Sequence, residues 1–140
     1  MTRSSRFIVA VHALALLARA GGGAMTSDTI AASVNTNPVV VRRVLGRLAR
    51  AGLVVTQKGA KGGVRLRRPP ADIELGEVYA AVESGPLFAA PPRRPNTQCP
   101  VGSGLADALD PALHAAEDAV QSVLARTTLA TVVRRLRSRM

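Results

Sequence analysis

Apolar residues recur at helical spacing in several separate stretches of the chain. The first, residues 7–18, is almost entirely apolar, follows Ser4 or Ser5 as a cap and ends at three glycines, which predicts a first helix. Thr26 or Ser27 caps a second, shorter helix over residues 28–34. A tight polar turn of three residues leads from it into the next stretch. Two helices joined by so short a turn predict a helix-turn-helix.

The third stretch predicts a helix that starts at Pro38. Asn37 is a good N-cap, and Pro38 suits the first helical position, where its missing N–H costs nothing. Gly52 supplies a C-terminal stop. The apolar stripe of this helix consists of Val41, Val44, Leu45 and Leu48, and the arginines largely off that stripe are Arg42, Arg43, Arg47 and Arg50. We therefore expect one face to pack on a core and the other to carry cations.

Two β-rich runs follow this helix at once. Residues 53–58 and 64–68 are separated by Gly59-Ala60-Lys61-Gly62-Gly63, and in the second run Arg65 and Arg67 alternate with apolar residues. The alternation predicts a hairpin with one wet, cationic face. A helix with free arginines followed by a basic hairpin is the arrangement of a winged helix-turn-helix. In that fold the helix enters the major groove while the wing grips the DNA backbone.

The pattern changes again after the hairpin. Residues 75–84 predict another helix, and prolines and glycines from Gly85 onwards predict a loop over 85–110. Regular structure is expected to resume at about Pro111, with two amphipathic stripes separated near Thr127-Thr128. The expected fold is mainly α with a small β-hairpin wing, plus a long C-terminal dimerisation helix. Its parts are a winged helix-turn-helix over 1–84, the loop, and dimerisation helices over 111–140. The alternative, a tail that covers its own winged helix, stays open because periodicity does not identify the partner.

The net charge of +10 is unevenly placed along the chain. Residues 1–70 hold twelve Arg or Lys and a single acid, Asp28, whereas residues 71–140 hold seven basic and eight acidic residues. An excess of cations confined to the winged helix suits a polyanion partner. Three aromatic residues are too few for the stacking platforms of single-stranded nucleic-acid binding. The alternatives are a solvated basic surface, a protein-interaction module with an acidic partner, and a non-specific nucleic-acid-binding protein.

Four short motifs occur in a fixed order over some forty residues. They are the run from Val44 to Val54, the Gly59-Ala60-Lys61-Gly62-Gly63 loop, Arg68-Pro69-Pro70 and Leu75-Gly76-Glu77-Val78. Together they resemble the Rrf-two family of bacterial winged-helix transcription regulators. The resemblance implies a homodimeric repressor or activator, with the long helix as the dimer interface, that often senses iron–sulfur, redox or nitrosative status. It also implies that Val39, Arg42 and Arg43 occupy the variable specificity positions.

Geometry favours the same three residues for reading bases. The N-terminal turns of a recognition helix enter the major groove first, which places Val39, Arg42 and Arg43 near base edges. Arg43 suits a guanine edge, with two hydrogen bonds, and Val39 suits a thymine methyl group. Arg47, one turn further on, is expected to meet a base edge or a phosphate. Two arginines at these positions lead us to expect a G-containing half-site.

Other residues are expected to grip the DNA backbone. Lys58, Lys61 and Gly62 belong to the wing loop, where glycine lets main-chain N–H groups approach phosphate. Ser5, with the N-terminus of the first helix, adds a further phosphate contact. The glycines also invite comparison with a nucleotide-binding loop. The spacing lacks the Gly-Lys-Ser/Thr of such a loop and no helix begins there, which disfavours nucleotide binding.

Cys99 is the single cysteine of the chain. One cysteine excludes an internal disulfide and an internally complete cysteine-ligated metal site, so no cofactor is expected. Many members of the resembled family hold an iron–sulfur cluster with three cysteines, whereas Cys99-Pro100-Val101-Gly102 matches its single-cysteine members. Pro100 at a helix start would make Cys99 the N-cap, and with Arg93 and Arg94 nearby in sequence the thiolate is favoured. A redox-sensing thiol and a residue without chemistry both remain open.

No enzymatic constellation emerges from the sequence. His12 lies within an apolar helix and His114 on the tail, and neither has an acid or nucleophile at a telling spacing. A metal site shared across a dimer by Cys99 and His114 is a further alternative, disfavoured because a closed site normally needs four ligands. We expect a protein that is not an enzyme.

Residues 7–18 mimic a signal peptide. His12 interrupts the run, Arg19 lies close to the would-be cleavage site, and the stretch is well short of the roughly 20 residues of a membrane span. We therefore expect a cytoplasmic homodimer that reads a palindromic double-stranded DNA operator and has no membrane partner.

Overall fold

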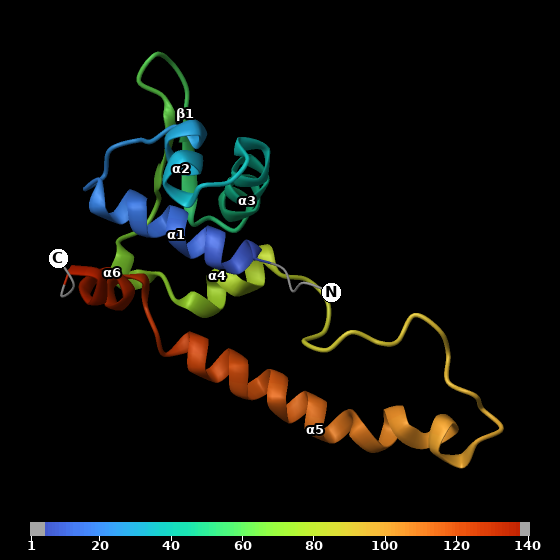
Figure 1. Ribbon diagram of the computed structural model, residues 1–140. Coiled ribbons are helices and arrows are strands. Elements are labelled where there is room, and N and C mark those ends of the chain that lie inside the picture. The colour runs from blue at the N-terminus through green and yellow to red at the C-terminus, as the bar shows by residue number, and fades with distance from the viewer. Residues whose placement is uncertain (1–4, 138–140) are drawn as a thin grey trace.

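The computed structural model describes residues 5–137 and has the mainly helical, winged architecture predicted from the sequence (Figure 1). The predicted cap Ser4 lies outside the described residues. The elements in chain order are α1 (Arg6–Arg19), α2 (Ser27–Val34), α3 (Pro38–Arg50), β1 (Val54–Gln57), β2 (Gly63–Leu66), a 3₁₀ turn η1 (Pro70–Asp72), α4 (Leu75–Val82), α5 (Pro100–Ala125) and α6 (Leu129–Arg137).

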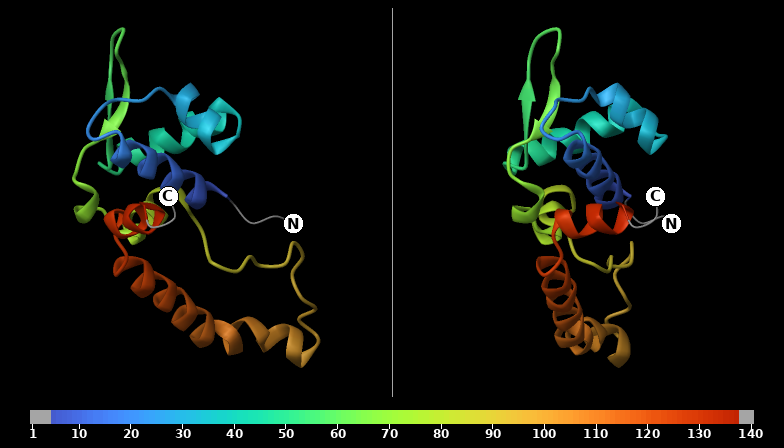
Figure 2. Two further views of the ribbon diagram at one scale, coloured as in Figure 1. Left: turned by 60° about the vertical axis from the view of Figure 1, so that its left-hand side comes forward. Right: turned by 90° about the vertical axis from the view of Figure 1, so that its left-hand side faces the viewer.

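One aliphatic core holds five of the helices and the base of the hairpin together as a head (Figure 2). Leu14 of α1, Ile30 of α2 and Leu48 of α3 are fully buried in it. The whole predicted apolar stripe of α3 is buried, which leaves its opposite face for solvent. The core therefore fixes which way the arginines of α3 point.

The start and end of α3 are formed as the sequence predicts. The Asn37 side chain accepts a hydrogen bond from the Val39 N–H at 2.8 Å, and Pro38 occupies the first helical position. Gly52 adopts a left-handed φ of 78° just beyond the C-terminus, a conformation that glycine adopts without strain. At the preceding helix, Thr26 is the cap and its hydroxyl accepts from the Thr29 N–H.

The hairpin is anchored to the head by its second strand. Strands β1 and β2 are antiparallel with Thr56 opposite Val64, and Val64 also forms a bridge with Met25 in the α1–α2 linker. The Met25 N–H donates to the Val64 carbonyl at 2.9 Å, and the reverse bond measures 2.8 Å. These two bonds tie the base of the wing to the head next to α2.

Helix α5 begins at Pro100, so the prediction that regular structure resumes near Pro111 was wrong. Pro111 lies inside the helix, where it removes one backbone hydrogen bond without ending the helix. The stripe of Val101, Leu105 and Leu109 already holds helical spacing before the proline. Figure 1 shows α5 projecting away from the head, and none of its residues, all of which the structure describes, is buried.

Helix α6 belongs to the head, which corrects the expectation that the whole tail forms a dimer. The chain breaks at Thr127-Thr128 as predicted, and α6 returns to pack on α1 with Leu129 fully buried and Val133 nearly so. The Leu129 N–H donates to the Ile73 carbonyl at 2.9 Å, which fastens the return. The alternative of an intramolecular cover therefore holds for α6. Helix α5 contacts α4 and the loop after it near its C-terminal end, where the Leu87 N–H donates to Glu117 at 3.1 Å, and its N-terminal half extends away from the head.

Candidate nucleic-acid interface

The outward face of α3 carries the residues expected to read DNA. Arg42, Arg43 and Arg50 are exposed, Val39 is 42% exposed, and Arg47 is half-buried. None of these guanidinium groups is buried in the core, because the apolar stripe of the same helix fills that side. The face is therefore cationic and open, with an apolar group near its N-terminal end.

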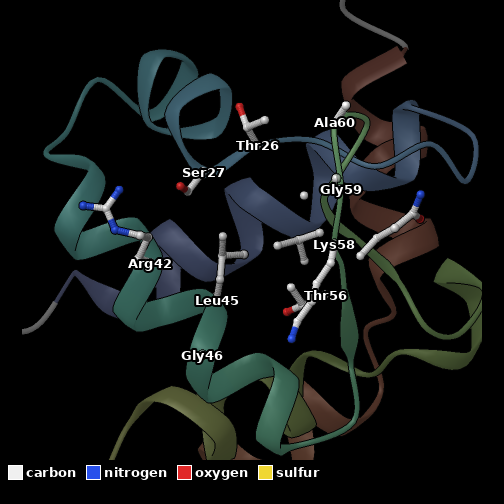
Figure 3. A pocket seen from close by; sticks show the side chains of 13 residues that line it. Thr26, Ser27, Arg42, Leu45, Gly46, Thr56, Lys58, Gly59 and Ala60 are labelled. Carbon is white, nitrogen blue, oxygen red and sulfur yellow. The ribbon is translucent and has the colours of Figure 1, made fainter.

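A groove of about 650 Å³ separates α3 from the hairpin (Figure 3). Arg42 and Gly46 line its α3 wall, and Lys58 stands on the hairpin wall. Thr26 and Ser27, at the N-terminal end of α2, close the groove between those walls. The hydroxyls, the helix N-terminus and the two cations all favour an anion.

Asp28, the only acidic residue among residues 1–70, slightly weakens the positive potential of the groove. The Arg42 Nη1 and Asp28 Oδ1 atoms are 3.9 Å apart, and both side chains are more than half exposed. A pair so open to water contributes little and breaks readily. Arg42 therefore remains available to an incoming phosphate or base.

A smaller recess, of about 280 Å³, lies beside α3. It is lined by Val40, Arg43 and Arg47 together with Arg6 of α1. Ser5 precedes Arg6 as the N-cap of α1; it is exposed and its side chain makes no capping hydrogen bond. Ser5, which is predicted to contact the DNA backbone, is thus the neighbour of Arg6. Arg6 lines the same recess as Arg43 and Arg47, which are predicted to contact bases. Arg6 also pairs with Glu83 at 3.6 Å, so Arg43 and Arg47 supply most of the positive charge of this recess.

The wing presents its lysines but uses one of its glycines internally. Lys58 and Lys61 are exposed. The Gly62 N–H donates to the Gly59 carbonyl at 2.9 Å, so it is not directed at a phosphate. A side chain at Gly62 would overlap the carbonyl oxygens of Gln57 and Gly59. Packing within the turn therefore accounts for Gly62, which corrects the reasoning that placed it among the phosphate contacts.

Sequence reasoning missed several residues of this surface. The structure adds polar and small residues that line the groove: Thr26, Ser27, Gly46 and Thr56. The helix periodicity of α3 is the signal that could have placed Gly46 opposite the apolar stripe. The approach of the α2 N-terminus to the wing depends on the Met25–Val64 bridge, for which the sequence carries no local signal.

The sequence profile of the Rrf2 family, described as an iron-dependent transcriptional regulator, matches residues 3–135. The chain belongs to the Rrf2 family. It is 39% identical to YwnA of Bacillus subtilis, described as an HTH-type transcriptional regulator, over 95% of this chain and 98% of that one. The structure of Staphylococcus aureus CymR in an oxidized form is 27% identical with a TM-score of 0.70, covering 95% and 96% of the two chains. IscR of T. potens, 22% identical over 100% and 92%, shares the fold with a TM-score of 0.75.

The family assignment confirms the resemblance and the winged helix-turn-helix fold predicted from the sequence. This Rrf2 protein is a DNA-binding transcription regulator, a class without enzymatic activity. The open arginine face of α3 and the groove beside the wing supply the surface that such a regulator needs. Within residues 5–137, no helix is both long enough and apolar enough to cross a bilayer.

Cys99 lies at the far end of α5 from the reading helix (Figure 1). It is the exposed N-cap of α5 with Pro100 at the first position, as predicted. The nearby backbone N–H groups of Gly102 and Val101 lower the pKa of its thiol, although Cys99 makes no capping hydrogen bond of ordinary geometry. Arg93 and Arg94, which were predicted to favour the thiolate, do not contribute to the lowering of this pKa. The helix start itself therefore favours the thiolate.

The donor set of this Rrf2 chain does not fit an iron–sulfur cluster. Such clusters are held by several cysteine thiolates, and the chain has one. Within the described part of the chain, no three His, Cys, Asp or Glu side chains gather as metal ligands. His114 lies fifteen residues along α5 from Cys99, about 22 Å by helical rise, and bonding to the Asp110 carbonyl raises its pKa. The two residues cannot meet on one metal within a chain.

Proposed function

We propose that this Rrf2 protein is a homodimeric, sequence-specific repressor that reads a palindromic operator in the cytoplasm, with sensing at Cys99. The observation that carries the DNA part is the exposed arginine face of α3 beside an open, anion-favouring groove. Val39, Arg42 and Arg43 read base edges from the N-terminal turns of α3. Arg47 contacts a base edge or a phosphate one turn further along.

Backbone contacts flank the reading helix on two sides. Lys58 and Lys61 of the wing grip phosphates on one side, and Ser5 at the N-terminus of α1 does so on the other. Contacts of this kind set the register of the protein on the duplex without reading its sequence. Two heads gripping the duplex exclude other proteins from the same segment, which is sufficient for repression.

The exposed apolar stripe of α5 supports the homodimer. Val101, Leu105, Leu109 and Val123 are 66%, 48%, 44% and 53% exposed, and they follow one side of the helix. A contiguous apolar stripe of this length marks an interface rather than a water-facing surface. Ala112 lies at the middle of the stripe and lets a second helix come close. A second copy of α5 is the matching partner, because a two-fold axis pairs such a stripe with itself.

Antiparallel pairing of the two α5 helices suits the operator. Each head is attached at the C-terminal end of its α5, so antiparallel helices carry the heads at opposite ends (Figure 1). The 26 residues of α5 span about 39 Å, which is close to the roughly 34–36 Å between successive major-groove half-sites. Parallel pairing would bring both heads to the same end of the helices. The length of α5 therefore supports two adjacent half-sites.

A gel shift in competitor DNA tests the proposal. We expect retention of one operator by the protein at physiological salt while a large excess of unrelated DNA is present. Retention that any DNA abolishes equally would show charge-driven binding only, and would favour a protein-interaction or non-specific nucleic-acid-binding role.

Lys61→Ala is expected to lower the slope of log affinity against log salt by about one unit and to leave the preferred sequence unchanged. Lys61 is exposed at the tip of the wing, where it meets phosphate rather than bases. Filter binding over a salt series measures the slope, and Arg19→Ala, an exposed cation at the other end of α1, is the control. A changed sequence preference would contradict the assignment of Lys61 to the backbone.

Cys99 is proposed as the sensing thiol, with a hydroperoxide as the oxidant. The thiolate sulfur attacks the terminal peroxide oxygen, the O–O bond breaks, the alcohol or water leaves, and Cys99 becomes a sulfenic acid. Its exposure and the lowered pKa of its thiol support this step. In the antiparallel dimer, the N-terminal end of one α5 lies beside the head of the partner subunit. Oxidation there alters how the two heads are held.

Cys99→Ser is expected to abolish the response of operator affinity to peroxide while leaving the affinity of the reduced protein unchanged. Serine keeps the size and capping capacity of the residue but not the redox chemistry. Titrating the operator with reduced and peroxide-treated protein measures the response, and mass spectrometry follows oxidation of the wild-type thiol. An equal response of Cys99→Ser and wild type would end the sensor proposal.

A further inference from the structure

Gly46 is a glycine in the middle of a helix for which the interior of the molecule gives no reason. It lies within the thirteen residues of α3, and it is not among the glycines with positive φ. A Cβ built on Gly46 would come no closer than 3.8 Å to another group, the Nη1 atom of Arg50 at the end of a flexible side chain. Alanine would therefore fit in the free protein and would favour the helix.

The only space that a side chain at Gly46 would enter lies outside the protein. Gly46 is on the face of α3 opposite the buried stripe, and it lines the groove between α3 and the hairpin (Figure 3). Arg42 and Arg50 lie one turn away along the helix on either side. The glycine thus opens a notch in an otherwise cationic helix face.

The lining of the groove identifies what enters this notch. The groove that Gly46 lines is also lined by Thr26 and Thr56, by the N-terminal end of α2 at Ser27, and by Arg42 and Lys58. Arg42 is assigned to a base edge, whereas the lysine, the hydroxyl groups and the helix N-terminus suit a chain of phosphates. The groove is open along the protein surface between α3 and the wing (Figure 3). A continuous strand therefore fits it better than a single small anion.

We infer that Gly46 is the point at which α3 is approached by the sugar–phosphate backbone of the DNA strand that passes between this helix and the wing. The absence of a Cβ lets the strand reach the helix backbone. This inference rests on the proposed function and deepens it. It makes Gly46 a positioning residue at which one strand is held against α3, without reading a base itself.

The test compares Gly46→Ala with Gly104→Ala. Gly104 lies in α5, is exposed, and a Cβ there would also meet nothing within 4 Å. Both changes are expected to raise Tm by about 2–5 °C, since alanine is the better helix former. We expect Gly46→Ala alone to weaken DNA binding, by about 5- to 100-fold, and by the same factor on the operator and on random DNA.

Three results would overturn the inference. Unchanged DNA affinity of Gly46→Ala would show that no strand comes close to this position. A loss confined to particular operator sequences would place a base edge, not the backbone, against Gly46. An equal loss in Gly104→Ala would show that the effect does not arise in the groove. Wild-type protein is titrated first: if it binds no DNA, the proposed function fails, whereas failure of Gly46→Ala alone leaves that function standing.

Discussion

Leu105→Glu combined with Leu109→Glu is expected to leave the protein as a 14.6 kDa monomer in place of the proposed dimer and to lower operator affinity by about a hundredfold or more. Both leucines are more than two-fifths exposed in the isolated chain, on the stripe proposed to meet a second α5. Two carboxylates buried in an apolar seam without partners would cost more than the interface supplies. A single head would then bind one half-site without the gain from linkage to the other.

Sedimentation equilibrium measures the mass of this double variant, and titration of an operator with both half-sites measures its affinity. Gln121→Glu is the control, because it introduces a glutamate at an exposed position on the opposite side of α5. This variant should remain dimeric. The head does not use either leucine in its core, so circular dichroism should show the wild-type helix content. A variant that stays dimeric with both glutamates would remove α5 as the dimer interface.

The charge pattern of α5 is consistent with this arrangement. Helix α5 contains four acidic residues and no Lys or Arg. The acidic residues are Asp107, Asp110, Glu117 and Asp118. The head carries exposed cations on α3 and the wing, and others at the end of α1 and on α6. An acidic helix is repelled by DNA while the heads are attracted, which would orient the proposed dimer with both α3 helices toward the duplex.

Local sequence signals predicted the head well because each signal acts within a few residues. Asn37 and Pro38 fix the start of α3, and Gly52 supplies the left-handed position that ends it. The alternation of Val64 with Arg65 likewise predicted a strand with one wet face, and Val64 is buried while Arg65 is exposed. Each of these interpretations depended on neighbours along the chain, and each is confirmed.

The expectations that failed depend on contacts between distant parts of the chain or on one strong local signal. Pro111 reads as a helix start, yet the helical turn before it is already formed and proline is tolerated inside α5. Leu129 belongs to a stripe that suits a dimer equally well, and only its burial against the head shows its partner. Gly62 lies in a glycine-rich loop of the kind that binds phosphate, but the close approach of the Gln57 carbonyl oxygen explains why glycine is needed there. Periodicity identifies an apolar face but not what covers it.

Arg43→Ala is expected to weaken operator binding by about 1–3 kcal/mol and to relax the preference for one base pair in each half-site. Arg43 is exposed on the second turn of α3, within reach of a guanine edge when the N-terminal part of the helix enters the groove. Selection of binding sites from random DNA should enrich guanine at that position for the wild type and lose it for the variant. Arg134→Ala removes another exposed cation, from α6, and should keep both affinity and preference. Selection of purely A·T half-sites by the wild type would reject the reading assigned to Arg43, because its two donors match the two acceptors of guanine.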